Sequence, residues 1–238
     1  FFGIDSGVRH AVTGADYGTV RTAAFMGYRM IAAAAGLKVS SEEAPLRVED
    51  PRWGGYLANL RPGEFADSYE GALPVEMEGA EFLARFGGIT DPVTRVEPGH
   101  RYPIRQATAH PIHEQARVTR FAELLGIPGL SDGTAVELGR LMYASHRSYG
   151  SCGLGHPGTD RLVELVAELG TGRGLFGAKI TGGGSGGTVA VLARDGARAE
   201  IEALAQRYRE ETGQGGEVFA DSGPGAAETG VLELALRR

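Results

Sequence analysis

Apolar positions recur at helical spacing over residues 17–36 and in short strand-like runs elsewhere. The helical stripe contains Val20, Ala23, Ala24, Gly27, Met30, Ile31 and Ala34, and Gly36 stands where the helix should end. An apolar run at residues 1–4 stops at Asp5-Ser6-Gly7, which predicts an opening strand. This strand begins at the first residue, without an initiator Met or a signal peptide, so we expect a fragment or a processed product.

Residues 38–105 are the least regular part of the chain. Most of its 11 prolines, its single tryptophan and several acidic residues fall there. Proline removes a backbone donor and interrupts regular elements. We therefore expect an insertion with small helices, one of them over 76–86.

Strong periodicity returns after residue 105. We expect helices beginning at Pro111 and at Ser131, a third capped by Thr159, and a fourth over 196–212; strands are expected at 178–180, 189–192, 218–220 and 231–236. Strands that return on one another with helices to one side predict an α+β sandwich.

Composition limits the classes of function. The 238 residues are 42% hydrophobic, which is enough for a packed core. A net charge of −6 without any run of five basic residues argues against a nucleic-acid surface, and no apolar run has the length of a membrane span. One cysteine excludes an intrachain disulfide and suits a reducing cytoplasm.

The 38 glycines cluster, and the densest cluster lies between two predicted strands. It contains Thr181, Gly182, Gly183, Gly184, Ser185, Gly186 and Gly187, followed by Thr188. Without Cβ atoms, such a loop lets backbone N–H groups approach a phosphate or an oxyanion. We interpret it as a binding loop.

Other interpretations of the same residues are weaker. The dinucleotide pattern at 182–187 lies between two strands, whereas that motif needs a strand followed by a helix. A serine hydrolase would need a histidine after Ser185, and all six histidines precede it. His110, His113 and Glu114 have no identifiable third metal ligand, so we expect surface histidines at a helix start and no metal site.

A second polar segment, Asp5 to His10, follows the opening strand and leads to Asp16 and Tyr17. It is equally compatible with an ordinary turn and with a wall of groups that bind a polar ligand.

Gly177 to Thr188 resembles the third motif of the GHMP small-molecule kinases. Ser6 to Arg21 resembles their galactokinase branch. Several short stretches are similar to its arabinokinase subgroup: Gly3–Gly7, Phe25–Gly27, Leu141–Tyr143, Cys152–Gly155 and Ser222–Ala226.

The resemblance implies an α+β fold in two parts. Residues 1–36 would be the end of the amino-terminal lobe and a linking helix. Residues 37–238 would be the ferredoxin-like GHMP C-terminal domain, with the insertion at 38–105. It also implies transfer of a phosphoryl group from ATP, with Mg²⁺, to the anomeric hydroxyl of L-arabinose or D-galactose. Tyr17 and Asp16 would bind the sugar, and the loop would lie beside the phosphates.

The family's nucleotide loop and its Gly-Glu-His-x-Asp sugar motif are absent from these residues. The resemblance therefore places the catalytic Asp, its Arg partner and the Mg²⁺ ligands before Phe1, and we expect this chain to be inactive alone. Two alternatives stay open. One is a non-catalytic sensor of sugar and nucleotide. The other is a split kinase, in which a separate chain would supply the amino-terminal lobe next to an exposed opening strand.

Overall fold

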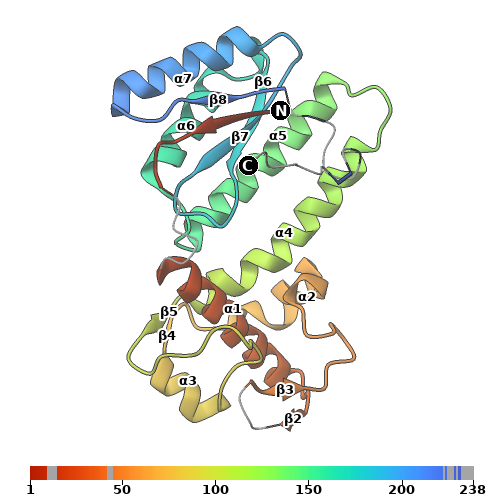
Figure 1. Cartoon of the computed structure of the whole chain (residues 1–238). Coiled ribbons are helices and arrows are strands. Elements are labelled where there is room, and N and C mark those ends of the chain that lie inside the picture. The colour runs from red at the N-terminus through yellow and green to blue at the C-terminus, as the bar shows by residue number, and fades with distance from the viewer. Residues whose placement is uncertain (10–14, 42–44, 222, 224–227, 229, 232–238) are drawn as a thin grey trace.

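The computed structural model describes residues 1–9, 15–41, 45–221, 223, 228 and 230–231 (Figure 1). Its helices are α1 (Ala15–Ala34), α2 (Pro62–Ser68), α3 (Gly79–Phe86), α4 (Ile104–Leu125), α5 (Asp132–Ser151), α6 (Pro157–Leu169) and α7 (Arg198–Thr212). Its strands are β1 (Phe2–Asp5), β2 (Val39–Ser41), β3 (Arg47–Val48), β4 (Met77–Glu78), β5 (Arg101–Tyr102), β6 (Leu175–Ile180), β7 (Thr188–Ala193) and β8 (Val218–Phe219). The α+β class is confirmed.

The main sheet has the strand order β6-β7-β1-β8, with antiparallel neighbours. The opening strand β1 is an inner strand, because Gly3 pairs with Ala190 on one side and with Phe219 on the other. The expectation of an exposed, unpaired opening strand is therefore wrong. Strands far along the chain supply both neighbours, and this pairing cannot be read from the local sequence.

Helices cover both faces of this sheet, and not one face as expected. On one face, Ile4, Val189 and Val191 pack against residues of α6 and α7. On the other face, Phe176 and Leu192 pack against residues of α5. The pairing register of β6 with β7 shifts between Leu175 and Gly177. Because apolar residues occupy both odd and even positions of these strands, each face needs its own cover.

A second core lies at the other end of the molecule, and α4 runs from one end to the other (Figure 1). In this core, residues of α1 and of the first half of α4 pack against large side chains of the irregular segment. We call α1 and residues 45–112 the helical region, and β1 with residues 124–219 the sheet region. The two cores do not follow the expected division at residue 36, and those domain boundaries stay a prediction.

Two predicted helix starts are wrong. Pro111 lies inside α4, which begins at Ile104, because burial of Ile104, Ala107 and Ile112 compensates for the hydrogen bond that proline removes. Helix α6 is capped by His156, whose Nδ1 accepts from the N–H of Gly158, while Thr159 is buried in the first turn.

Helices α1, α3, α5 and α7 agree closely with the predicted spans. Most of the strand predicted at 231–236 lies outside the described residues. Among the helices that the structure describes, none has the length and apolarity needed to cross a bilayer.

Candidate functional site

The glycine loop between β6 and β7 is fixed by backbone hydrogen bonds to two distant segments. The N–H of Ser185 donates to the carbonyl of Leu154 at 2.7 Å, and the N–H of Gly187 donates to the carbonyl of Val8 at 3.0 Å. Ser6 holds the other side, because its N–H and its hydroxyl both donate to the carbonyl of Gly187, at 3.0 and 2.6 Å. The loop is therefore a defined structure, and the polar segment after β1 is one of its walls.

Two of the loop glycines are needed for close packing. Gly184 has a φ of +90°, and a Cβ built on it would lie 2.6 Å from the carbonyl oxygen of Leu154. A Cβ on Gly186 would lie 2.7 Å from a methyl carbon of Val8. Side chains at either position would push the loop away from its supports.

The remaining loop groups differ in what they can offer a ligand. The hydroxyl of Thr181 is not available to donate to a ligand, because it already donates to the carbonyl of Thr188 at 2.7 Å. Within the described part of the chain, the amides of Gly182, Gly183, Gly184 and Gly186 have no hydrogen-bond partner. Backbone amides grouped in this way suit a phosphate.

Tyr149, near the end of α5, connects the loop to its surroundings. Its hydroxyl donates to the carbonyl of Gly182 at 3.0 Å. Its ring meets the His110 ring edge-on at 4.9 Å between centroids, and the Lys179 ammonium lies 5.6 Å from its centroid. Burial, helped by the nearby Glu114 and Tyr17, raises the pKa of Tyr149.

Tyr17 lies in the first turn of α1 and is 37% exposed. Arg21 follows one helical turn later, on the same side of the helix. Asp16 precedes Tyr17 on α1, but its side chain lies outside what the structure describes.

Arg21 is fixed by an ion pair from the irregular segment. Its Nε and Nη2 donate to the two carboxylate oxygens of Asp91 at 2.7 and 2.8 Å. The Asp91 side chain is fully buried and also accepts from Thr94. The hydrogen bond from Arg21 is the main cause that holds the pKa of Asp91 well below its usual range. A charged pair thus ties α1 to the irregular segment one helical turn after Tyr17.

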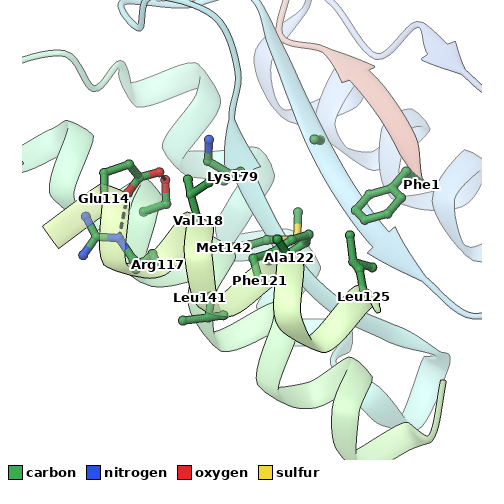
Figure 2. A pocket seen from close by; sticks show the side chains of 12 residues that line it. Phe1, Glu114, Arg117, Val118, Phe121, Ala122, Leu125, Leu141, Met142 and Lys179 are labelled. Atoms are coloured by element: carbon green, nitrogen blue, oxygen red, sulfur yellow. Dashed lines mark hydrogen bonds and ion pairs between the residues drawn. The ribbon is translucent and has the colours of Figure 1, made fainter. Parts of the chain in front are cut away.

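A cavity of about 340 Å³ opens between α4, α5 and the sheet (Figure 2). Phe1, Phe121 and Leu125 lie at its apolar end, and Glu114 and Lys179 lie at the other. Although burial opposes it, hydrogen bonds from Ser145 and Arg117 hold the pKa of Glu114 below its usual range.

The histidines of the α4 motif are placed differently from the sequence expectation. His110 lies inside α4, with Nδ1 2.8 Å from the Ser148 hydroxyl, and burial lowers its pKa. His113 packs against Phe65. Neither marks a helix start. Within the described residues, no group of three or more His, Cys, Asp or Glu side chains could hold a metal ion.

Sequence reasoning overlooked Tyr149, His110 and Lys179 as neighbours of the loop. The pairing of α4 with α5 brings Tyr149 and His110 together, and no local pattern indicates it. Lys179 had a usable signal, because it is one of only two lysines in a chain with 22 arginines and precedes the loop by two residues.

Residues 127–210, which include the glycine loop and its supports in α5, match the family model described as GHMP kinases C terminal. This match agrees with the resemblance that the sequence motif indicated. The whole chain is 40% identical to an L-arabinokinase of Arabidopsis thaliana, over 262 aligned residues, and covers 25% of that protein. It is 33% identical to a galactokinase of Thermotoga maritima over 116 residues, 46% of this chain and 30% of that protein.

A solved structure supports the same fold. The crystal structure of Lactococcus lactis galactokinase complexed with galactose matches 92% of this chain and 43% of that one, with a TM-score of 0.57 and 19% identity. The resemblance to the galactokinase branch and to L-arabinokinase is confirmed. The chain spans between a quarter and a third of the length of these curated relatives.

Proposed function

We propose that this chain is the C-terminal part of an ATP-dependent sugar kinase that phosphorylates the anomeric hydroxyl of L-arabinose or D-galactose. The observation that carries the proposal is the glycine loop, which is fixed by hydrogen bonds while the amides of Gly182, Gly183, Gly184 and Gly186 have no partner among the described residues. The 40% identity to an L-arabinokinase over the whole chain supports the same function.

In this proposal Tyr17 and the glycine loop have different roles. Tyr17 and Asp16 bind sugar hydroxyls, and the loop of residues 181–187 binds the phosphates through the amides of Gly182, Gly183, Gly184 and Gly186, which have no partner among the described residues. Phosphoryl transfer depends mainly on positioning and on stabilisation of charge, which a rigid loop of amides provides. Mg²⁺ and ATP supply the transferred group and neutralise part of its charge when bound.

The amides and Lys179 fit a phosphate, and the described residues contain no cluster of three or more His, Cys, Asp or Glu side chains that could hold a metal ion. We assign the metal ligands, the catalytic Asp and its Arg partner to an amino-terminal lobe, carried by the same polypeptide or by a partner. This chain alone is then inactive, and we expect the complete enzyme in the cytoplasm.

The test is an ADP-release assay on the intact native protein with Mg²⁺, ATP and a panel of pentoses and hexoses. We expect turnover with L-arabinose or D-galactose, and none with this chain alone. Sugar binding without ADP release from any member of the panel would favour a sensor and would contradict the kinase proposal. A requirement for a separate polypeptide would identify a split enzyme.

A further inference from the structure

We propose that Lys179 binds the terminal phosphate of the ligand at the glycine loop, an inference that rests on the proposed function. The shared chemistry is a phosphate with at least two negative oxygens. It could be the γ-phosphate of a nucleotide or the phosphate of a sugar 1-phosphate.

The backbone directs Lys179 toward the loop. Gly177 of β6 packs directly on Gly139 of α5, so strand and helix are in close contact at this point. Lys179 follows by two residues and therefore emerges on the same face of the sheet, along α5. Its ammonium lies 5.6 Å from the ring centre of Tyr149, and that residue's hydroxyl holds the carbonyl of Gly182. Figure 2 shows the ammonium at the end of the cavity that also holds Glu114.

The charge of Lys179 is not neutralised by its described surroundings. Glu114, the carboxylate of this cavity, is already bonded to Ser145 and to Arg117, at 2.5 and 2.6 Å. The Oδ1 atom of Asp160 lies 3.2 Å from Nε2 of His146. Lys179 forms no ion pair with a carboxylate of the described residues, and its charge contributes to lowering the pKa of both His110 and His146. A half-buried ammonium without a counter-ion among the described residues favours an anionic ligand.

The choice of lysine also fits this role. The chain uses arginine for its ion pairs, with 22 arginines and only two lysines. A guanidinium is broad and planar, whereas an ammonium is a compact point charge that fits beside a tight loop. Lysine and the loop amides would therefore contact different oxygens of one phosphate.

Binding measurements on the intact native protein test this inference with a matched control. We expect Lys179→Met to weaken binding of ATP, galactose 1-phosphate or both by about tenfold or more, the loss of one charge-assisted hydrogen bond. Lys179→Arg should recover part of the affinity. Lys38→Met, which changes the only other lysine, should bind like the wild type. Galactose itself should bind all four proteins equally.

The ligand that loses affinity identifies the source of the phosphate. Loss for ATP alone indicates the γ-phosphate, and loss for galactose 1-phosphate alone indicates the product. Phosphate ligands that bind Lys179→Met as tightly as the wild type would overturn the inference, as would an equal loss for galactose. Since kinase turnover is assayed separately, a wild-type protein that binds these phosphates without turnover contradicts the proposed function and leaves this inference standing.

A second measurement does not depend on a variant that must fold. Amine acetylation followed by peptide mass spectrometry reports Lys179 and Lys38 in the same wild-type sample. We expect phosphate-bearing ligands to slow the labelling of Lys179 about tenfold at saturation while that of Lys38 is unchanged. Equal labelling of Lys179 with and without these ligands would contradict the proposal.

Discussion

In the proposed site, the sheet region and the helical region are held in place in physically different ways. The glycine loop of the sheet region is fixed by backbone hydrogen bonds to Val8 and Leu154, and no titratable side chain is part of these bonds. In the helical region, Arg21, which lies one helical turn after Tyr17 on α1, is held by the buried carboxylate of Asp91. The glycine loop is therefore sensitive to side-chain volume, and the support of α1 is sensitive to charge.

In the proposed site, this difference suits the glycine loop to a phosphate and Tyr17 to a sugar. A phosphate needs donors at fixed positions, and a backbone loop provides them without side-chain entropy. A sugar is recognised by individual hydroxyl contacts, which a side chain on a helix can adjust. Substitutions in the two regions should therefore fail in different ways.

The largest effect is expected in the loop. Gly184→Ala places a Cβ 2.6 Å from the carbonyl oxygen of Leu154 at a φ of +90°, and should cost about 3 kcal/mol of stability and abolish kinase activity. Gly196→Ala is the matched control, because Gly196 has a φ of +84° but open space around it, and should cost only about 1 kcal/mol. Urea denaturation and ADP release measure both. Equal effects of the two variants would show that packing against Leu154 is unimportant.

A smaller effect is expected from the charged pair. Asp91→Asn leaves Arg21 without its counter-ion and should cost about 2 kcal/mol, reduced from the fully buried case because Arg21 is 33% exposed. The low pKa of Asp91 stabilises the fold above the unfolded value of about 3.9, and this stabilisation is lost as the pH falls below it.

Denaturation at neutral and acidic pH tests this account of Asp91. The variant should lose less stability than the wild type as the pH falls, because other carboxylates with lowered pKa values, such as Glu114, remain, while Glu81→Gln, which breaks an exposed pair with Arg85, should leave stability nearly unchanged. An Asp91→Asn variant with the wild-type acid profile would contradict the account.

In the sheet region, His146 makes the stability of the fold depend on pH. Its Nδ1 accepts from the N–H of Ile180 at 3.3 Å, and its Nε2 lies 3.2 Å from Asp160. His146→Phe should cost about 2 kcal/mol by leaving both groups without partners. Burial lowers the pKa of His146, opposed by Asp160, so the wild type should lose stability as the pH falls below the unfolded value of about 6.5.

The slope of stability against pH between about pH 8 and about pH 5 tests this prediction. It should decrease in His146→Phe, whereas His100→Gln, at an exposed contact with Thr19, should keep it. An unchanged slope in His146→Phe would contradict the assigned role.

The smallest effect is expected at Tyr17. Tyr17→Phe removes one hydroxyl and should weaken sugar binding by about 1 kcal/mol, without changing stability because the side chain is 37% exposed. Tyr56→Phe, at a tyrosine that is 68% exposed in the helical region, is the control. Calorimetric titration with the preferred sugar measures both. Unchanged sugar affinity in Tyr17→Phe would remove Tyr17 from the site.

Local elements could be predicted from the sequence better than the contacts between distant segments. The strands beside the glycine loop and the helices α1, α5 and α7 follow from periodicity, because each buries its own apolar face. The start of α4 was missed because tertiary burial outweighs the local penalty of Pro111. The inner position of β1, the Asp91–Arg21 pair and the contact of Tyr149 with His110 all join distant segments, and local spacing does not encode them.

The most direct test of the central claim is a phosphorus NMR spectrum of the intact native protein with Mg²⁺, ATP and L-arabinose or D-galactose. The claim is that Tyr17 and the glycine loop are the two walls of one sugar-kinase site. It predicts a new phosphomonoester signal coupled to the anomeric proton, with a matching conversion of ATP to ADP. ATP that is consumed without a sugar phosphate, or a phosphate on another hydroxyl, would contradict it.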